Sequence, residues 1–206
     1  MIKAISVDLG GVLFSEGKKI ALDKLKKEFG YSRRKILKLI RGRHSKVAAD
    51  WRRGKVKEKD FWEYVQKNLP VGYDVELIKK EWWNGYKLDQ KILDLIIGLK
   101  SQGYKIMAFS GNVKDRIDFL EDKYHFRQYF DEEVYSFDEG LIKADEDFYD
   151  CLIEKSGCSP EEIVHIDDQE KVEEVGGGKG INFIFYKDHN IKKLKKDLAT
   201  LKVKLD

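Results

Sequence analysis

Long apolar runs, cysteines and net charge are all scarce in this sequence of 206 residues. The first apolar segment runs into glycines rather than a small-residue cleavage site, and we expect neither a signal peptide nor a membrane span. The two cysteines, Cys151 and Cys158, have no metal-ligand spacing and indicate reduced thiols in a cytoplasmic protein. Charged residues make up 37% of the chain but leave a net charge of only +3, so we expect neither a nucleic acid nor a membrane as partner.

The apolar residues that are present allow a sizeable core, since they make up 42% of the chain. A chain of this length fits one α/β domain, or a core domain that carries a small insert. The apolar pattern favours the second arrangement because it becomes purely helical after residue 15 and alternates between helix and strand again from about residue 87.

The first apolar segment, residues 2–14, reads I-K-A-I-S-V-D-L-G-G-V-L-F. It predicts a buried strand that ends at Asp8 and is followed by a turn at Gly10 and Gly11. In an open α/β sheet ligands bind at the carboxyl ends of the strands, so Asp8 is a candidate nucleophile or metal ligand. An aspartate here can also cap the turn through backbone amides, and this segment alone does not decide between the two interpretations.

Residues 16–86 carry apolar residues at helical spacing and no strand pattern. One helix is expected before Gly30, a second after a cap at Ser32, and two more over residues 56–69 and 74–83. An insert after the first strand lies above that strand's carboxyl end, so we expect this helical segment to be a lid.

A basic run, R-G-R-H-S-K-V-A-A-D-W-R-R-G-K over residues 41–55, lies between the second and third of these helices. Its guanidinium groups can bind an anionic substrate, although such a run more often forms a solvated face. The four tryptophans of the insert can stack on a ligand ring, but packing of the lid's own core is the favoured interpretation. They are Trp51, Trp62, Trp82 and Trp83.

From residue 89 onward helices and strands alternate, which predicts a Rossmann-like parallel sheet flanked by helices. A buried strand over residues 104–109 ends in Ser110, Gly111 and Asn112, directly before a helix. Free amides and a hydroxyl at this position form an anion site, although most turns of this kind are ordinary helix caps. A second strand is expected over residues 133–137, and Lys143 precedes the next helix.

A short apolar strand over residues 163–166 ends in the adjacent carboxylates Asp167 and Asp168. Adjacent carboxylates repel each other unless a cation compensates them, so a divalent metal is the natural explanation. His165, just before the pair, is expected to be a packed and hydrogen-bonded histidine rather than a catalytic one. A last strand over residues 181–186 and an amphipathic helix complete the predicted core.

The order of these motifs, V-D-L-G-G-V-L-F, A-F-S-G-N, G-L-I-K-A-D and H-I-D-D, resembles that of the haloacid dehalogenase superfamily. The resemblance implies an α/β core formed by residues 1–15 and 87–206, with an inserted helical cap formed by residues 16–86. Within the insert, R-G-K-V-K-E-K-D-F-W is similar to a cap segment of the epoxide hydrolase amino-domain-like branch.

The resemblance also implies a role for each motif. Asp8 would accept the phosphoryl group as an aspartyl phosphate, Ser110 would hold its oxygens, and Lys143 would neutralise charge. The substrate site would comprise Gly10, Ser110, Gly111, Asn112 and Lys143, and Mg²⁺ would be held by Asp8, the Gly10 carbonyl, and Asp167 or Asp168. These parts supply the positioning and charge neutralisation that phosphoryl transfer needs.

Three positions depart from the family pattern. Most phosphatases of the superfamily have a second aspartate two places after the nucleophile to protonate the leaving group, and this chain has Gly10 there. Val172 replaces the usual asparagine after the acidic pair, and three glycines at 176–178 predict a short or irregular helix. Ala144 replaces the usual proline after the lysine. Glu16 and His44 of the insert are the candidate replacements for the missing acid.

Three functions remain open from the sequence. The favoured one is a magnesium-dependent phosphatase for a small phosphorylated metabolite. The second is a 2-haloacid dehalogenase that forms an alkyl ester on Asp8; this chemistry needs no metal, so the acidic pair argues against it. The third is a catalytically weak protein that binds a phosphorylated ligand or a partner, which Gly10 and Val172 favour.

Overall fold

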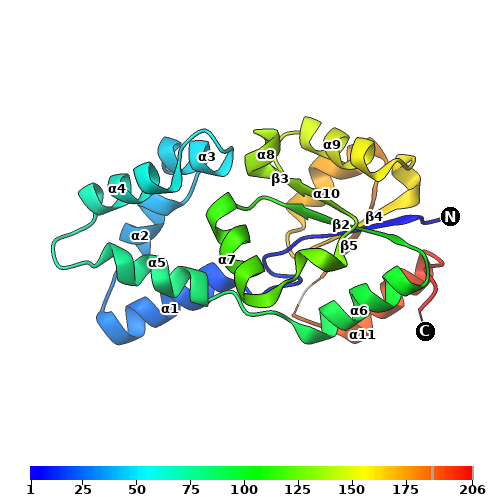
Figure 1. The fold of residues 1–206 in the computed structure, drawn as a ribbon, viewed down its shortest axis with the longest axis horizontal. Coiled ribbons are helices and arrows are strands. Elements are labelled where there is room, and N and C mark those ends of the chain that lie inside the picture. The colour runs from blue at the N-terminus through cyan, green and yellow to red at the C-terminus, as the bar shows by residue number, and fades with distance from the viewer. Residues whose placement is uncertain (187, 206) are drawn as a thin grey trace.

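The computed structural model describes residues 1–186 and 188–205, and its centre is a parallel sheet of five strands (Figure 1). The strand order is β3-β2-β1-β4-β5, and every neighbouring pair is parallel. The first strand along the chain therefore lies in the middle of the sheet, as in other doubly wound α/β folds. The strands are β1 (Ala4–Val7), β2 (Lys105–Ser110), β3 (Glu132–Tyr135), β4 (Ile163–Asp167) and β5 (Asn182–Phe185).

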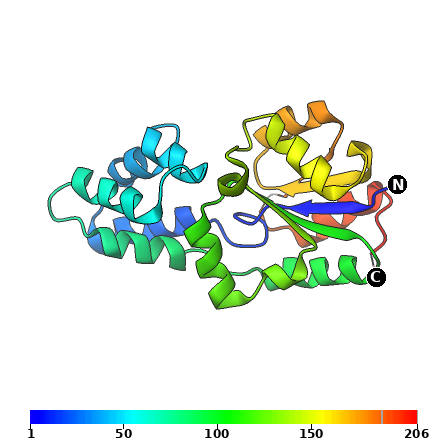
Figure 2. The same cartoon turned by 45° about the horizontal axis from the view of Figure 1, so that its top comes forward.

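Helices cover both faces of this sheet, as the sequence predicted. In Figures 1 and 2, α9 and α10 lie on one face, and α6 and α11 on the other. The bounds of the core helices are α6 (Gln90–Ser101), α7 (Lys114–Tyr124), α8 (Ser136–Glu139), α9 (Asp147–Ser156), α10 (Lys171–Gly176) and α11 (Ile191–Thr200). Because both faces are covered, β1 and β4 are buried along their whole length.

The region after β4 is irregular, as its glycines predicted. Helix α10 has only 6 residues and continues into a 3₁₀ turn over Gly177–Lys179. Gly176 is needed there because a Cβ atom would lie 2.5 Å from both the Tyr149 and the Phe183 rings. The strand expected over residues 133–137 is shorter and earlier than predicted, because Ser136 already begins the single-turn α8.

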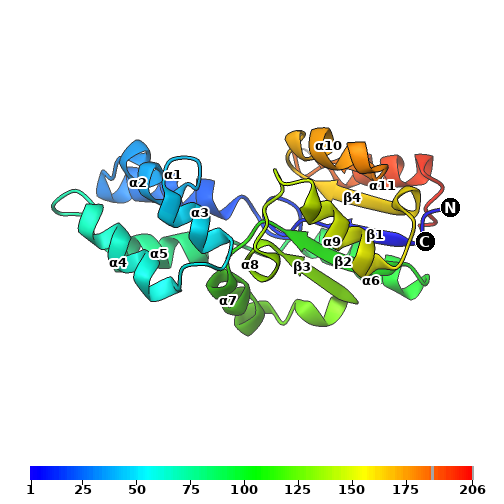
Figure 3. The same cartoon turned by 90° about the horizontal axis from the view of Figure 1, so that it is seen from above.

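The helical insert comprises α1 to α5, which lie together at one end of the molecule, away from the sheet (Figure 3). Their bounds are α1 (Gly17–Phe29), α2 (Arg33–Ile40), α3 (Lys46–Arg52), α4 (Glu58–Asn68) and α5 (Val75–Asn84). Over residues 1–186 and 188–205, no helix is long and apolar enough to cross a membrane.

Helix α3 was not among the four helices expected in the insert. It lies within the basic run 41–55, where Ser45 caps it by accepting a hydrogen bond from the backbone N–H of Ala48. Ala48 and Trp51 then share the buried face of this helix. These two turns of helix could not be recognised in the sequence, because a segment with so few apolar residues does not show the helical period of 3.6 residues.

The four tryptophans pack against one another in the core of the insert, as predicted. Trp51 stacks on Phe61 with ring centroids 3.7 Å apart. Trp62 and Trp82 meet edge to face at 5.9 Å, and Trp83 lies against both of them. All four tryptophans are buried, so they form the insert's core rather than an exposed stacking platform.

Candidate active site

Parallel pairing brings the predicted polar residues to one edge of the sheet. Val7 of β1 is level with Ala108 of β2 and with Ile166 of β4. Asp8 and Asp167 therefore emerge side by side, and Ser110 follows at the end of the neighbouring strand. The Asp8 backbone N–H donates to the Ile166 carbonyl at 2.9 Å, which fixes the chain at the point where the side chain leaves the strand.

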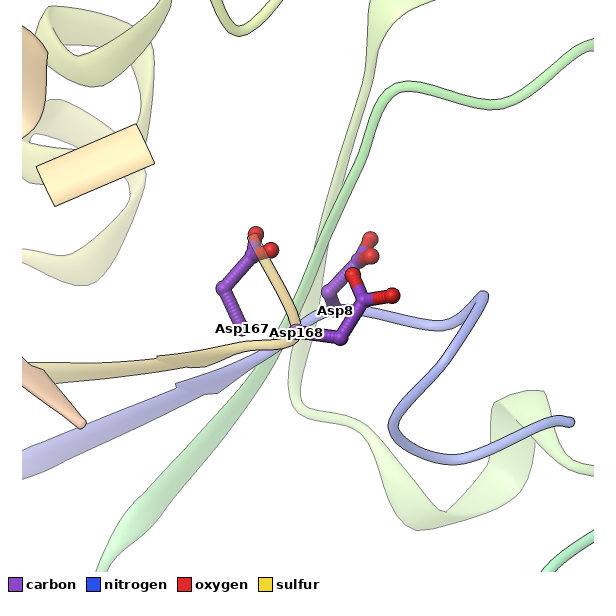
Figure 4. A group of neighbouring side chains, drawn as sticks. All are labelled: Asp8, Asp167 and Asp168. Carbon is purple, nitrogen blue, oxygen red and sulfur yellow. The ribbon is translucent and has the colours of Figure 1, made fainter. Parts of the chain in front are cut away.

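Three carboxylates converge at this edge. Asp8, Asp167 and Asp168 each offer an oxygen atom, and these atoms lie within 4.8 Å of one another (Figure 4). Asp8 and Asp167 are 4% and 2% exposed. Burial raises the pKa of Asp8, Lys143 opposes this shift, and Asp167 adds to it. Such a cluster is costly unless positive charge is held close to it.

Lys143 supplies one such charge. Its ammonium lies 2.8 Å from Asp8 Oδ1 and 2.5 Å from Asp167 Oδ2. Burial alone would lower the pKa of Lys143, but the carboxylates of Asp167 and Asp8 outweigh it and raise the pKa. Lys143 is therefore a fixed cation that bridges β1 and β4, although it comes from the loop before α9.

Asp167 and Asp168 have different surroundings, although the sequence did not show which of the two is the metal ligand. Asp167 accepts hydrogen bonds from Lys143, from the His165 ring at 3.0 Å, and from the backbone of Gln169 at 2.8 Å. Burial acts to raise the pKa of Asp167, but Lys143 and His165 outweigh it and hold the pKa below its ordinary value. Burial, Asp8 and Asp167 raise the pKa of Asp168 to about 7.

The carboxylate oxygens of this cluster fit a hard divalent cation. Asp168 lines the cavity, and its only side-chain hydrogen bond within the described residues is a long one of 3.4 Å from Gln169. Asp8 and Asp168 can thus each give an oxygen, whereas the oxygens of Asp167 are engaged by Lys143, His165 and Gln169. An all-oxygen set of this kind is what Mg²⁺ binds, usually through a few carboxylates with further positions left to water and phosphate.

His165 is buried and hydrogen-bonded, as expected. Its ring joins Ser6 Oγ at 3.0 Å on one side and Asp167 Oδ2 at 3.0 Å on the other. Burial lowers the pKa of His165, although the Asp167 hydrogen bond opposes the shift. The ring packs against Phe109 and Phe183 in the core. It therefore positions the Asp167 carboxylate through the hydrogen bond and is not among the residues that line the cavity.

The loop from Ser110 to Asn112 forms the second wall of the site. Ser110 and Asn112 are buried, and all three of its residues line the cavity. The Asn112 side chain accepts from the backbone of Val113 at 3.0 Å, and its carbonyl accepts from Ser136 Oγ at 2.9 Å. Apart from its two chain neighbours, no described residue lies within 4 Å of a Cβ built on Gly111, so this part of the loop stays open to a ligand.

The cavity above these residues has a volume of about 670 Å³, which suits a small molecule. Gly11 lies in close contact with Asp168, because a Cβ on Gly11 would lie 2.2 Å from Asp168 Oδ2. The φ angle of Gly11 is +98°. Gly10 has no such restriction: its φ is not left-handed, and a Cβ would make an ordinary contact of 3.4 Å with the Tyr86 ring.

Several residues at the cavity had no signal in the sequence. Tyr86, at the end of the insert, and Arg116 of α7 both line it, and Arg116 Nη1 donates to the Tyr86 hydroxyl at 2.9 Å. Lys18 of α1 lines it as well. The basic run, which was expected to be a solvated face, also contributes, because Arg41, Arg43 and Arg52 line the same cavity.

The two candidate replacement acids are placed differently from each other. Glu16 lines the cavity but is exposed and paired with Lys19 at 2.8 Å. His44 is exposed and accepts a hydrogen bond from Arg43 Nε at 3.1 Å, and it is not among the residues that line the cavity.

A family model for haloacid dehalogenase-like hydrolases matches residues 2–176. The match includes β1 to β4, the whole helical insert and each motif residue described above. The chain is a haloacid dehalogenase-like hydrolase. Its sequence is also 42% identical, over 164 residues, to an uncharacterized protein of Dictyostelium discoideum; the aligned region is 78% of this chain and 69% of that relative.

Solved structures of haloacid dehalogenase-like proteins share the whole fold. A family enzyme of Bacteroides thetaiotaomicron in a complex with magnesium and inorganic phosphate has a TM-score of 0.75 and 20% identity, covering 90% of this chain and 94% of its own. L-2-haloacid dehalogenase of Xanthobacter autotrophicus, with chloropropionic acid covalently bound, has a TM-score of 0.61 and 16% identity, covering 99% and 85%. At these identities the likeness concerns the fold alone.

Proposed function

We propose that this hydrolase is a magnesium-dependent phosphatase that acts on a small phosphorylated metabolite through an aspartyl phosphate on Asp8. The observation that carries the proposal is the pair of contacts made by Lys143, which holds the Asp8 carboxylate at 2.8 Å within a cluster of three carboxylates. The oxygen-rich cluster next to a buried cation is suited to a phosphoryl group and a divalent metal together.

In this mechanism Asp8 is the nucleophile. One carboxylate oxygen attacks phosphorus while the bond from phosphorus to the ester oxygen breaks, and the leaving alkoxide takes a proton. Water then attacks the phosphorus of the aspartyl phosphate, releasing inorganic phosphate and restoring Asp8. Lys143 remains charged throughout, because the carboxylates around it raise its pKa, and it offsets the negative charge on the transferring oxygens.

The loop residues orient the phosphoryl group. Ser110 and the amides of Gly111 and Asn112 donate to its oxygens, at the amino-terminal side of α7. Asp8, Asp168 and the Gly10 carbonyl would hold Mg²⁺, and Asp167 would support the site through Lys143. The bound cation would neutralise charge on the phosphoryl oxygens. Glycine at position 10 leaves the leaving group without its usual acid, which favours good leaving groups.

We also propose that residues 16–86 are a cap domain on a core formed by residues 1–15 and 87–206. The four tryptophans support this division, because they pack against one another in the core of the insert. Arg53, directly after α3, donates to the Gly140 carbonyl at 3.2 Å and pairs with Asp145. These contacts hold the helical insert against the loop that carries Lys143, so the insert is placed to close the cavity over a bound substrate.

The carboxylate cluster favours this proposal over dehalogenation. An alkyl ester on Asp8 needs no metal, whereas three converging carboxylates are most simply balanced by a divalent cation beside Lys143. A second candidate, a weak enzyme that mainly binds a phosphorylated ligand, is favoured by one observation: Gly10 offers no side chain to protonate the leaving group.

The experiment is a phosphatase screen with p-nitrophenyl phosphate and a panel of phosphorylated metabolites, with and without Mg²⁺. We expect turnover that is lost on chelation and restored by Mg²⁺. Release of halide from 2-chloropropionate that persists in excess chelator would replace the proposal with the dehalogenase. Tight phosphate binding with no turnover of any ester would favour the binding protein.

A further inference from the structure

Four buried or half-buried cationic side chains surround the cavity on the side of the helical insert, beside the exposed Lys19 and Arg43. They come from four separate elements: Lys18 of α1, Arg41 directly after α2, Arg52 of α3 and Arg116 of α7. We call these four residues the cationic mouth. All four line the same cavity as Asp8, Ser110 and Lys143, so one small ligand can contact both sets.

The members of the cationic mouth have no carboxylate partner among the described residues, whereas their neighbours in sequence do. Lys19 pairs with Glu16 at 2.8 Å, and Arg53 pairs with Asp145, but the adjacent Lys18 and Arg52 form no ion pair within the described part of the chain. Charged groups at a partly buried site are normally paired, so unpaired cations that face a cavity point to an anionic ligand.

These cations also repel one another. Burial, together with smaller contributions from Arg52, Arg41 and Arg116, lowers the pKa of Lys18 to about 8, and Asp168 acts in the opposite direction. Burial likewise lowers the pKa of Arg52, and Arg41 contributes to that shift. Lys18 therefore lies within electrostatic reach of both the arginines and the acidic cluster. A bound anion between the two sets would relieve the repulsion.

Arg116 is the most firmly positioned member. Its side chain is 6% exposed and lies over the rings of Trp82, Trp83 and Tyr86, with centroids 4.6 to 5.0 Å from the guanidinium carbon. Nη1 donates to the Tyr86 hydroxyl, but the buried Nε has no hydrogen-bond partner in the described structure. Aromatic faces hold the cation in place without neutralising it, which leaves its charge for a ligand.

The charges of the site indicate more than one anionic group. Lys143 and a divalent cation balance the three carboxylates of the floor. A phosphate monoester then brings about two negative charges at neutral pH, and the cationic mouth offers four positive ones. Two cations would remain without a partner if the substrate ended in a neutral group.

Building on the phosphatase function proposed above, we infer that the substrate is a phosphate monoester with a second anionic group, a phosphate or a carboxylate, which the cationic mouth binds. Asp8 attacks the first phosphate while arginines hold the second group at the other end of the cavity. Guanidinium groups suit this role because they bind both carboxylate and phosphate oxygens through paired N–H donors.

The test compares three substrates that share a carbon chain: propyl phosphate, 3-(phosphonooxy)propanoate and propane-1,3-diyl bisphosphate, at fixed free Mg²⁺. We expect kcat/KM to be about 10- to 100-fold higher for a substrate with the second anion, mainly through a lower KM, the range of one or two charged hydrogen bonds. The carboxylate and bisphosphate arms show which anion is preferred.

Variants of the cationic mouth test the cause of this preference. Arg52→Gln and Arg41→Gln should each reduce the ratio of kcat/KM between the dianionic and the simple substrate by about tenfold. Arg52→Lys should reduce it by less, because lysine keeps the charge but not the paired N–H donors. Arg34→Gln is the matched control, because Arg34 is exposed on α2, away from the cavity, and should leave the ratio unchanged. Melting temperatures show that each variant is folded.

A binding measurement keeps this inference separate from the phosphatase proposal. Calorimetry with propylphosphonate and propane-1,3-diyl bisphosphonate needs no turnover, and the second ligand should bind at least tenfold more tightly. Turnover without any preference for a second anion would overturn the inference and leave the phosphatase intact. No turnover, with tighter bisphosphonate binding that Arg52→Gln removes, would overturn the phosphatase and support the cationic mouth. Equal affinity for both phosphonates would overturn the inference that the cationic mouth binds a second anionic group.

Discussion

Replacing Gly10 with aspartate tests whether the missing acid limits the rate. The structure accommodates this change, because φ at Gly10 is not left-handed and the new Cβ would lie 3.4 Å from Tyr86 Cε1, an ordinary van der Waals distance. The backbone carbonyl that would hold the metal is retained. Gly10 lines the same cavity as Asp8, so the new carboxyl group would stand where most phosphatases of the superfamily carry this acid.

The expected gain depends on the leaving group. General acid catalysis is typically worth about 10²–10⁴-fold, and it matters most for poor leaving groups. Gly10→Asp should therefore raise kcat/KM for propyl phosphate by about 100-fold. The same variant should raise turnover of p-nitrophenyl phosphate by less than about threefold, since p-nitrophenolate leaves without a proton. Steady-state kinetics on both esters measure the two ratios directly.

Two controls accompany this measurement. Gly10→Ala adds the Cβ without the acid and should give no gain on either ester. Gly11→Ala should lower stability and give no gain in turnover, because φ at Gly11 is +98° and the added Cβ would lie 2.2 Å from Asp168 Oδ2. A folded Gly10→Asp protein with no gain on propyl phosphate, beside a wild type already fast on it, would refute the reasoning. The Tyr86 hydroxyl, whose ring adjoins Gly10, would then be the first donor to remove.

Four further results are expected. Asp8→Asn should abolish turnover, and circular dichroism should show an intact fold; more than a trace of activity would exclude Asp8 as the nucleophile. His165→Gln should cost about 1–3 kcal/mol in denaturant unfolding, because a buried hydrogen-bond partner is lost; a large loss of kcat at unchanged stability would contradict its structural role. Arg53→Gln should lower kcat several-fold, since it frees the insert from the Lys143 loop, and unchanged kinetics would show that these contacts are dispensable. Lys18 carries its charge below its pKa of about 8, so KM should rise as the pH passes 8, and Lys18→Met should flatten that rise.

The sheet and its acidic edge could be predicted from sequence because both depend on local pattern. Apolar runs marked the strands, and the polar residue after each run marked its end. Parallel strands place their carboxyl ends at one edge, so Asp8, Ser110 and Asp167 had to lie close together whatever the details of packing.

The division of labour between Asp167 and Asp168 could not be predicted in the same way. The two residues are adjacent in sequence and chemically identical. Their difference arises from contacts across the sheet: the His165 ring and Lys143 both donate to Asp167, and Asp168 lies beside Gly11. Such contacts depend on side-chain directions at the end of a strand, which no periodicity encodes.

The sequence raised anion binding by the basic run but favoured a solvated face, for a related reason. Arg41 and Arg52 belong to a run whose charge pattern is typical of a solvated surface, and Arg116 lies on a helix rich in charge. Only the packing of the insert against α7 brings these residues to one cavity. In sequence, an arginine that faces a ligand is identical to one that faces water, because the distinction lies entirely in the tertiary neighbours.

Arg52, the last residue of α3, and Arg53, directly after it, connect the cavity with the loop that carries Lys143. Arg52 lines the cavity, whereas Arg53 points to the core and donates to the Gly140 carbonyl and to Asp145. Asp145 in turn accepts from the backbone of Ile142, directly before Lys143. A movement of α3 that brought Arg52 toward a ligand would therefore also pull on the loop that holds Lys143. The position of the insert and the position of Lys143 are therefore linked through α3 and Arg53.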